Sequence, residues 1–355
     1  EPFDFKLASR MTFGAGTARR LPELLSAHGR LSTAILVDAG VASTPAYAEI
    51  KDLLVSAGLL NFEYVTSIVE PTFDEVDSIV EQYRAKAIDS LVVFGGGSSI
   101  DIAKGISILL TNPGKAIEYR GYGLVKNPGL PLFVLPTTAG SGSEVTPNAS
   151  YFDPSAMKKL GINSEHYLPR HVILDPILTV SCPEKATASA GLDALVHALE
   201  SFTARASTPL ARIFAREAFR LLFNSLGTVL SDPTNLAARG RMLLGAYYAG
   251  VALMNSASGP AGELSYPLGV RYKVPHGFAG AVFLAPVIKF NIEQGYMGYA
   301  ELFDLIEPTT ETTLTTSEKN QAFLKAVREL CKSAGAPTSL TALGVKENSL
   351  RPLAE

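Results

Sequence analysis

The pattern of apolar residues changes once along the chain, and this change limits the folds that the chain can adopt. Up to about residue 180, short apolar runs typical of strands alternate with segments of helical periodicity, an order typical of a parallel sheet covered by helices. After Pro183 the strand pattern ends and long amphipathic segments follow. We therefore expect an α/β domain with a parallel sheet over residues 1–180 and an all-α domain over residues 181–355.

The expected elements are short in the first half and long in the second. The predicted strands, each bounded by Gly, Pro, Asp or Asn, are Thr33–Asp38, Phe62–Thr66, Ser90–Phe94, Leu132–Pro136 and His171–Leu174. The predicted helices are Pro45–Ala57, Phe73–Lys86, Ser99–Leu110, Leu192–Ala204, Pro209–Leu226, Asn235–Ser256 and Glu318–Ala334. The Thr-rich segment Glu307–Ser317 is expected to be a loop.

Composition excludes several classes of protein. A net charge of −3 leaves no basic excess to neutralise phosphates, so we expect no nucleic acid partner. The first ten residues do not resemble a signal peptide and no apolar run is long enough to cross a membrane, so we expect no membrane partner. Cys182 and Cys331 are too few for a disulfide framework or a thiolate metal site, which favours a reducing, cytoplasmic location.

A glycine-rich loop follows the predicted strand Ser90–Phe94. It consists of Gly95, Gly96, Gly97 and Ser98, and the helix that follows carries Asp101. Glycines between a strand and a helix let the backbone approach a pyrophosphate, whose charge is then met by exposed N–H groups and the helix dipole. The same glycines also suit a tight turn for conformational reasons alone, and the triplet by itself leaves both interpretations open.

A second polar loop follows the next predicted strand and carries Thr137, Thr138 and Ser141. Open α/β sheets bind ligands at the carboxyl ends of their strands, so two such loops favour a cofactor site over an ordinary linker. Asp38 ends another strand, where a carboxylate can accept hydrogen bonds from ribose hydroxyls and repel a 2′-phosphate. This position favours NAD over NADP, although a helix or turn cap explains the same carboxylate equally well.

A carboxylate and two imidazoles form a possible metal site. Asp193 and His197 lie one turn apart in a predicted helix and face the same way. Their neighbours are apolar, and burying an ionised Asp there is unfavourable without a cation or a hydrogen-bond partner. His276 is the third candidate, whereas direct pairing of Asp193 with His197 is the simpler alternative. The remaining histidines are interpreted as structural or solvated, and they are His28, His166 and His171.

Taken together, these motifs resemble the iron-containing (group III) alcohol dehydrogenase family. The strings that carry the resemblance are GGGSSIDIAK, PTTAGSGSE, GLDALVHALE and VPHG, with the run Leu174, Asp175 and Pro176 between them. The resemblance implies NAD(P), Fe²⁺ or Zn²⁺, and a homodimer or larger homo-oligomer. It further implies a pyrophosphate loop of Gly95, Gly96, Gly97, Ser98 and Asp101, a second cofactor loop with Thr137, Thr138 and Ser141, a cofactor contact by Lys159, and metal ligation by Asp193, His197 and His276.

This chain departs from the family pattern at two positions. Gly262 stands where the family's fourth metal ligand, a histidine, is expected, and Tyr266 stands where a second histidine near the substrate is expected. The ion is then held by three protein ligands and water, or Glu263 replaces the missing ligand, or the site is weak or empty. We favour three ligands and water, because catalytic metal sites often keep an open position.

The function expected from this resemblance is the interconversion of an alcohol and an aldehyde or ketone by hydride transfer, with the metal as a Lewis acid. His276 and Tyr266 are the expected catalytic residues, and Tyr266 passes the proton unless it is only a packing aromatic. Gly262 is expected to enlarge the pocket and expose backbone, which favours a bulkier or more polar substrate such as a sugar or sugar acid. In this region the chain also resembles family members that act on 3-deoxy-octulosonate (Kdo), and this resemblance implies Kdo as the sugar acid. The rival functions are a lyase or cyclase similar to dehydroquinate synthase and an NAD-binding protein without turnover.

Overall fold

The computed structural model of the chain describes residues 2–7, 9–306 and 313–350, which form two compact units. The sheet unit is Leu7–Cys182, and the helical unit is Pro183–Glu355 together with Glu1–Lys6. The expected fold class, an α/β region with a parallel sheet followed by an all-helical region, is confirmed. Within the described part of the chain, no helix is both long and apolar enough to span a membrane.

The main sheet has six strands, and every strand pair in it is parallel. In spatial order the strands are β1 (Arg10–Phe13), β9 (His171–Leu174), β6 (Leu132–Pro136), β4 (Ser90–Gly95), β2 (Thr33–Asp38) and β3 (Leu60–Thr66). All five predicted strands are present. The edge strand β1 was not predicted, because its residues are mostly exposed and carry no run of apolar side chains.

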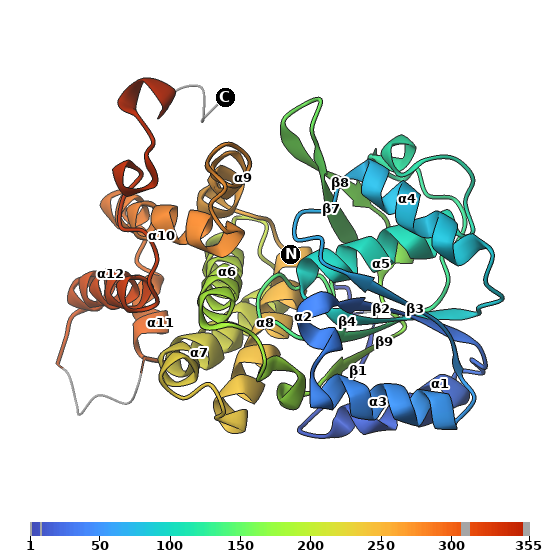
Figure 1. Ribbon diagram of the computed structural model, residues 1–355. Helices are drawn as coiled ribbons and strands as arrows, with labels where there is room; N and C mark the ends of the chain where they lie inside the picture. Colours follow the sequence, from blue (N-terminus) through green and yellow to red (C-terminus); the bar gives the residue numbers. More distant parts are fainter. Residues whose placement is uncertain (1, 8, 307–312, 351–355) are drawn as a thin grey trace. The chain divides into compact units, whose positions relative to one another are not determined.

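Helices cover both faces of this sheet. Figure 1 shows α1 (Leu21–Ala27) and α3 (Pro45–Ser56) on one face, and α4 (Phe73–Arg84) and α5 (Gly97–Leu109) on the other. Each inner strand supplies side chains to both layers: in β2, Ala34 and Leu36 pack with α4 and α5, and Ile35 and Val37 pack on the opposite side. Burial on both faces explains why these strands are continuously apolar rather than alternating.

A small second sheet was not predicted. Its strands, in spatial order, are β5 (Gly121–Tyr122), β8 (Lys158–Asn163) and β7 (Asn148–Asp153). The sequence of β8, KKLGIN, is half polar and partly exposed, which hides it from a search for apolar runs. The remaining short elements of this unit are η1 (Thr17–Arg20), α2 (Ala39–Ala42), η2 (Ala116–Tyr119), η3 (Glu165–Tyr167) and η4 (Pro176–Thr179).

The order of strands contains one reversal, and it lies at β2. This strand pairs with β3 on one side and with β4 on the other: the chain passes from β2 to β3, then returns past β2 to β4 and continues to β6 on the far side. The loops after β2 and β4 therefore diverge at their carboxyl ends, the place where open α/β sheets bind ligands. Asp38 ends β2 and Gly95 ends β4, which brings two of the predicted cofactor residues to this point.

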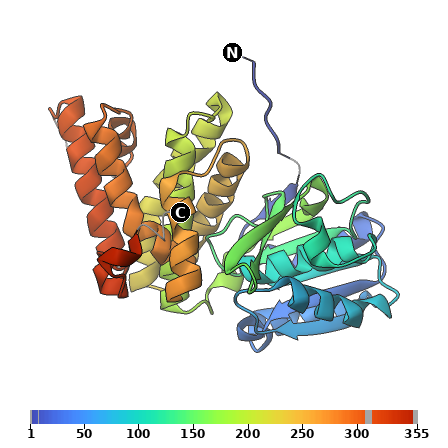
Figure 2. The same ribbon diagram turned by 90° about the horizontal axis from the view of Figure 1, so that it is seen from above.

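The helical unit is a group of closely packed helices. Its elements are α6 (Glu184–Thr203), α7 (Pro209–Ser231), α8 (Leu236–Met254), α9 (Pro260–Tyr272), α10 (His276–Glu293), α11 (Tyr299–Phe303), α12 (Thr316–Ser333), η5 (Thr341–Leu343) and η6 (Glu347–Ser349). α7 packs along α8 and α6, and α10 packs on α9 and α6; Figure 2 shows these helices side by side.

Three helices of this unit, α9, α10 and the short α11, were not predicted, and others have different ends. α9 and α10 each contain an internal proline, Pro267 and Pro286, which disfavours a helix in sequence-based reasoning. α6 begins at Glu184 rather than Leu192. α12 begins at Thr316, inside the expected loop, because Thr315 and Glu318 form a capping box; residues 307–312 of that loop lie outside the described residues.

The N-terminal segment belongs to the helical unit, although the sequence assigned residues 1–180 to one domain. Asn255 binds both backbone groups of Lys6: its Oδ1 accepts from the N–H at 2.6 Å and its Nδ2 donates to the C=O at 2.9 Å. Phe5 stacks on Phe214 of α7 with ring centroids 5.6 Å apart. These contacts explain why a segment that precedes the first strand groups with the second half.

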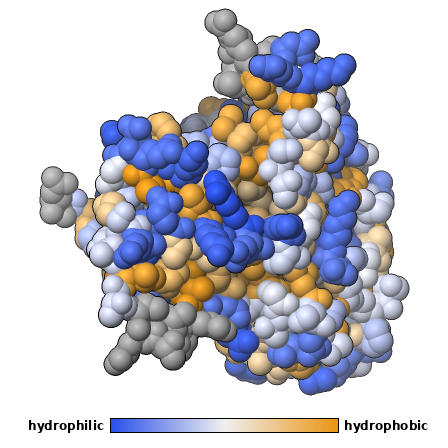
Figure 3. Space-filling view, turned by 90° about the vertical axis from the view of Figure 1, so that its left-hand side faces the viewer, coloured by the Kyte–Doolittle hydropathy of each residue, from blue (hydrophilic) through white to orange (hydrophobic). Residues whose placement is uncertain are grey.

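The surface of the helical unit does not identify a partner. Figure 3 shows hydrophobic areas broken up by hydrophilic ones on one face. Large apolar side chains of this unit that reach solvent include Ile213 and Phe290. Exposed apolar side chains of this kind are normal on protein surfaces, so the expected homo-oligomer stays a prediction.

Candidate metal centre and cofactor loops

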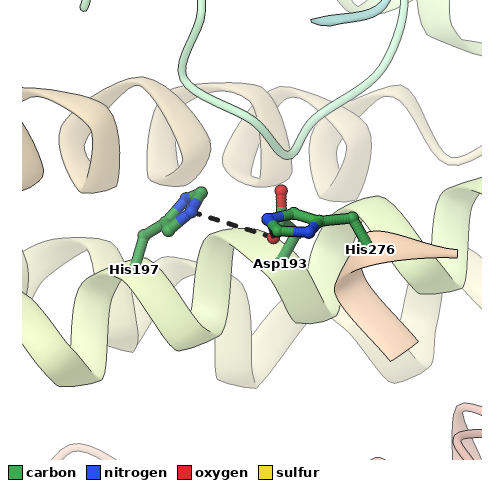
Figure 4. A group of neighbouring side chains, drawn as sticks. All are labelled: Asp193, His197 and His276. Atoms are coloured by element: carbon green, nitrogen blue, oxygen red, sulfur yellow. Dashed lines mark ion pairs between the residues drawn. The ribbon is translucent and has the colours of Figure 1, made fainter. Parts of the chain in front are cut away.

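The three proposed metal ligands come together in the helical unit. Asp193 and His197 lie one turn apart on α6, and His276 is the first residue of α10; Figure 4 shows Asp193 between the two imidazoles. Nε2 of His197 lies 3.8 Å from Oδ1 of Asp193, and Nε2 of His276 lies 3.7 Å from the same oxygen. One ligand atom from each residue lies within 4.8 Å of the others, a spacing at which three donors can share one cation.

The burial of these groups favours a cation between them. Asp193 is 8% exposed and His197 is 9% exposed. Nε2 of His197 lies 3.8 Å from Oδ1 of Asp193, which is too far for a hydrogen bond, so the simpler alternative of a direct hydrogen bond between these two atoms is not seen. A buried carboxylate is unfavourable without a compensating partner, and a divalent ion fits this set of one oxygen and two nitrogen donors.

The close approach of α10 to α6 places His276, and it depends on Gly277. A Cβ atom on Gly277 would lie 1.8 Å from the carbonyl oxygen of Ser189 and 3.0 Å from Cβ of Asp193. No side chain fits at such distances, so only glycine lets the first turn of α10 contact α6 here. Gly277 therefore brings His276 to the carboxylate of Asp193.

A serine on α9 contacts the far side of the His276 ring. Nδ1 of His276 lies 3.0 Å from Oγ of Ser265, and the same hydroxyl donates to the carbonyl of Gly262 at 2.5 Å. Ser265 is almost completely buried. It was not among the predicted site residues, because the contact joins two helices and leaves no local pattern in the sequence.

The space beside Gly262, where the resemblance led us to expect a fourth metal ligand, is filled by other groups of the protein. A Cβ atom on Gly262 would lie 2.7 Å from Oγ of Ser258 and 2.9 Å from Oε2 of Glu200. We expected Gly262 to enlarge the pocket, but the space directly beside its Cα atom is already filled by Ser258 and Glu200. Gly262 therefore leaves little room beside its own backbone.

Glu200 fills this space because it caps α9. Its carboxylate accepts hydrogen bonds from the backbone N–H groups of Gly259, Ala261 and Gly262, at 2.9, 2.6 and 3.1 Å. Burial raises the pKa of the Glu200 carboxyl, and the three backbone hydrogen bonds oppose this effect. A carboxylate at a helix N-terminus is also stabilised by the helix dipole. Glu200 thus fixes the start of α9 against α6.

Helix α9 carries two further residues that the sequence links to the candidate metal centre. Glu263 is exposed and is not part of the donor cluster, so the structure does not support it as a replacement ligand. Tyr266 is partly buried, and its ring centroid lies 4.9 Å from that of His276. The tyrosine therefore lies next to the candidate metal centre, and its catalytic role stays a prediction.

In the sheet unit, the two predicted cofactor loops lie against each other. The N–H of Thr137 donates to the carbonyl of Gly95 at 3.0 Å. A Cβ atom on Gly96 would lie 2.9 Å from Oγ1 of Thr138, and one on Gly97 would lie 2.6 Å from Oγ of Ser141. Side chains at the glycine positions would collide with the second loop, so the glycines are required for this close approach. The two loops form one continuous surface at the ends of β4 and β6.

Asp38 lies beside the glycine loop and also caps a helix. Its Oδ1 accepts a hydrogen bond from the N–H of Gly40 at 2.8 Å, at the start of α2. A Cβ atom on Gly95 would lie 3.5 Å from Cβ of Asp38. The two interpretations of Asp38, a cap and a residue of the cofactor site, are compatible in this geometry.

Ser98 and Lys159 both contact the segment after β3. The hydroxyl of Ser98 donates to the carbonyl of Val69, and Nζ of Lys159 lies 2.8 Å from Oε1 of Glu70. Lys159 lies on β8 of the small sheet. These contacts hold the segment around Val69 and Glu70 close to the start of α5.

Asp101 is turned toward the small sheet. It is 8% exposed, and its Oδ2 accepts a hydrogen bond from the N–H of Ser150 on β7 at 2.9 Å. Burial raises the pKa of this carboxyl. The geometry favours a structural role in joining α5 to β7, and a contact of Asp101 with pyrophosphate stays a prediction.

A buried lysine and glutamate follow the two loops. Lys104 of α5 donates from Nζ to the carbonyls of Thr146 and Asn148, at 2.8 and 2.7 Å. Burial lowers the pKa of Lys104 to about 8 and raises the pKa of Glu144 to about 7, and the attraction between the two groups opposes both effects. Neither residue was predicted from the sequence as a site residue.

The remaining histidines of the chain are not part of a donor cluster in the described residues. His171 lies in β9, and its Nε2 is 2.8 Å from Oγ1 of Thr12. His28 packs edge-to-face against His171 with ring centroids 5.9 Å apart, and burial lowers the pKa of both imidazoles. His166 is exposed. These positions agree with a structural or solvated role.

Comparison with known protein families covers nearly the whole chain. The family model described as "Iron-containing alcohol dehydrogenase" matches residues 8–176, and the model described as "Fe-containing alcohol dehydrogenase family, C-terminal" matches residues 187–355. Among curated proteins, the NAD-dependent methanol dehydrogenase of Bacillus methanolicus is 30% identical over 99% of this chain and 92% of its own length. The sulfoacetaldehyde reductase of Bilophila wadsworthia is 31% identical over 90% of this chain and 83% of its own length.

Solved structures agree with these sequence matches. A 1,3-propanediol oxidoreductase is similar with a TM-score of 0.93 and 29% identity, over 100% of this chain and 92% of that one. The sulfoacetaldehyde reductase of Bifidobacterium kashiwanohense, solved in complex with NAD⁺, is similar with a TM-score of 0.91 and 27% identity, over 99% of this chain and 91% of that one.

Proposed function

Since this chain belongs to the iron-containing alcohol dehydrogenase family, we propose that the sheet unit, Leu7–Cys182, is its NAD domain and that the helical unit is its metal and substrate domain. The chain is an oxidoreductase of a family that uses NAD and a metal and interconverts alcohols and aldehydes. The observation that carries the proposal is the convergence of one carboxylate and two imidazoles within 4.8 Å.

In the proposed metal centre, Asp193, His197 and His276 hold Fe²⁺ or Zn²⁺ as three protein ligands. When bound, the ion supplies a Lewis acid that lowers the pKa of a substrate hydroxyl. Tyr266, whose ring lies next to that of His276, is the proposed residue that carries the proton of the substrate hydroxyl. Its phenolic hydroxyl can both donate and accept a hydrogen bond. Gly262 adds no donor, which leaves coordination positions for substrate and water.

In the proposed cofactor site, the backbone of Gly95, Gly96 and Gly97 binds the pyrophosphate of NAD at the start of α5, with Ser98 and Asp101 in the same loop. Exposed N–H groups and the dipole of α5 support an anion there. Thr137, Thr138 and Ser141 bind the cofactor from the adjoining loop, and Lys159 reaches it from β8. Asp38 accepts from the ribose hydroxyls and repels a 2′-phosphate, so NAD is preferred over NADP.

We propose a sugar acid with a terminal hydroxyl, such as 3-deoxy-octulosonate (Kdo), as the natural substrate. The support is the loss of an imidazole at Gly262, which leaves more of the metal's coordination sphere for an oxygen-rich ligand. A cytoplasmic location and a homodimer or larger assembly also stay proposals. The rival lyase or cyclase and the silent NAD-binding protein are not favoured, because the relatives are named for alcohol and aldehyde oxidoreduction.

Replacing Asp193 tests the proposed metal centre. We expect Asp193→Ala to weaken metal binding by more than about 100-fold, because the loss of groups that only orient metal ligands already reaches that range. Metal content is measured by elemental analysis, and turnover by NADH absorbance with a panel of alcohols, aldehydes and sugar acids. Asp232→Ala is the matched control, since Asp232 is an exposed carboxylate of the same unit. Unchanged metal content and turnover in Asp193→Ala would contradict the proposal.

A further inference from the structure

The two ring nitrogens of His276 have different partners. Nε2 lies 3.7 Å from Oδ1 of Asp193, and Nδ1 lies 3.0 Å from Oγ of Ser265. A neutral imidazole carries one proton, on one of these nitrogens. The hydrogen bond made by Nδ1 therefore decides whether Nε2 has a lone pair available for an ion.

The direction of the hydrogen bond follows from the second contact of Ser265. The serine hydroxyl has a single proton, and it lies 2.5 Å from the carbonyl oxygen of Gly262, which can only accept. The proton of Ser265 is thus used in the bond to Gly262. Oγ must then accept from Nδ1–H of His276, because no other proton is available between these two atoms. Ser265 is 1% exposed, so bulk water does not compete for these contacts.

From this geometry we infer that Ser265 is a positioning residue for the metal centre: it holds His276 in the Nδ1–H form, so that the lone pair of Nε2 can bind the ion. The inference rests on the proposed metal function of Asp193, His197 and His276. In this form Nε2 of His276 and Oδ1 of Asp193 are two acceptors 3.7 Å apart, and a cation bound by both would stabilise that arrangement. Without Ser265, the imidazole can place its proton on Nε2 and donate toward Asp193, which closes the site to metal.

The position of Ser265 is itself fixed by the surrounding helices. Ser265 and Gly262 lie on α9, and Glu200 of α6 accepts from the N–H groups at the start of α9. His276 begins α10, and Gly277 holds that end of α10 on α6. The hydroxyl therefore has a fixed place between two helices that are both anchored to the helix carrying Asp193 and His197.

Metal affinity of the full chain tests this role. Zn²⁺ binding is measured by competition with a chromophoric chelator, without NAD or substrate, for the wild type and for Ser265→Ala. We expect Ser265→Ala to bind Zn²⁺ about 10- to 100-fold more weakly, the range typical of groups that orient metal ligands. Ser265→Thr keeps the hydroxyl and is expected to restore most of the affinity.

A control variant separates this effect from the loss of another hydrogen-bonded serine hydroxyl in the helical unit. The hydroxyl of Ser256 donates a hydrogen bond at 2.8 Å to the carbonyl of Ala252, which lies four residues earlier in the chain. None of the hydrogen bonds described for Ser256 has a histidine as partner. Ser256→Ala is therefore expected to bind Zn²⁺ like the wild type. The role of Ser265 would be overturned if Ser265→Ala bound Zn²⁺ within about 2-fold of the wild-type affinity. If Asp193→Ala then bound no Zn²⁺, the proposed metal centre would remain intact. Wild-type affinity in Asp193→Ala would instead remove the metal centre and, with it, this inference.

A second measurement does not depend on the folding of Ser265→Ala. Long-range ¹H–¹⁵N NMR of the metal-free wild type at alkaline pH reports which nitrogen of each imidazole carries the proton. The signals of His276 are assigned by their loss in His276→Gln. We expect the Nδ1–H form for His276, and finding the Nε2–H form would overturn the inference.

Discussion

Glu144 is a carboxyl group in the interior of the sheet unit, with Lys104 as its charged neighbour. Burial raises its pKa to about 7, so the folded protein holds a proton that the unfolded chain releases near the ordinary value for glutamic acid. For an acid whose pKa is raised on folding, the stabilisation is complete below the unfolded pKa. It is lost as the pH rises to the folded pKa.

We therefore predict that Glu144→Gln changes the pH dependence of stability. Between about pH 4.5 and 7 the wild type should lose up to about 3 kcal/mol more unfolding free energy than the variant, because a glutamine side chain does not titrate. Thermal unfolding by calorimetry across this range measures the difference. Glu81→Gln is the control, since Glu81 is exposed on α4. Parallel stability curves for the wild type and Glu144→Gln would show that Glu144 is already ionised at the acidic end.

At the scale of elements, the contact between α6 and α10 is the closest approach in the metal centre. It depends on one glycine, since a Cβ on Gly277 would lie 1.8 Å from a backbone oxygen of α6. Backbone cannot move as a flexible side chain does, so the two helices would have to separate. His276 would then move away from Asp193 along with the end of α10.

We predict that Gly277→Ala destabilises the helical unit by about 3 kcal/mol or more and also weakens metal binding. Circular dichroism during urea unfolding and Zn²⁺ titration measure the two effects. Gly227→Ala is the matched control: Gly227 lies in α7, and a methyl group added there would meet no other atom within 4 Å, so alanine should stabilise by about 0.5–1 kcal/mol. Equal stability of the two variants would show that α10 can shift without loss.

The elements that could be predicted from the sequence are those whose pattern is local. The inner strands, such as β2 and β4, are apolar along their whole length because both faces are buried, and each was predicted within two residues of its ends. β1, β7 and β8 were missed because their side chains are partly polar and their pairing comes from distant segments. α9 and α10 were missed because Pro267 and Pro286 disfavour a helix that tertiary packing nevertheless stabilises.

The same distinction applies to the candidate site. Asp193 and His197 could be identified because their spacing of one helical turn is visible in the sequence, and His276 because it lies in a family motif. Ser265 and Glu200 could not be identified in this way. Their roles come from contacts between helices that are separate in the sequence.

At the scale of the whole molecule, the two units have separate cores and separate candidate sites. The glycine loop and its partner loop lie in the sheet unit, and the three metal donors all lie in the helical unit. A ligand stabilises the state that binds it, so each ligand should act first on the unit that holds its site.

We predict that Zn²⁺ and NAD⁺ protect different parts of the chain from amide hydrogen exchange. Zn²⁺ at about 100 times its dissociation constant should stabilise the helical unit by about 2.7 kcal/mol and slow exchange most in α6, α9 and α10. NAD⁺ should slow exchange most around β4 and α5. Mass spectrometry of peptides after exchange measures both patterns. Stronger protection of α5 than of α6 by Zn²⁺ would contradict the assignment of the sites.

The attachment of the N-terminal segment has a practical consequence for labelling. Phe5 and Lys6 are held by Phe214 and Asn255, so these two residues are part of the helical unit even though the sheet unit follows them directly in the chain. A fluorophore joined near Phe5 therefore reports on events at α7 and α8. A reporter for the nucleotide loops has to be placed after Leu7, within the sheet unit itself.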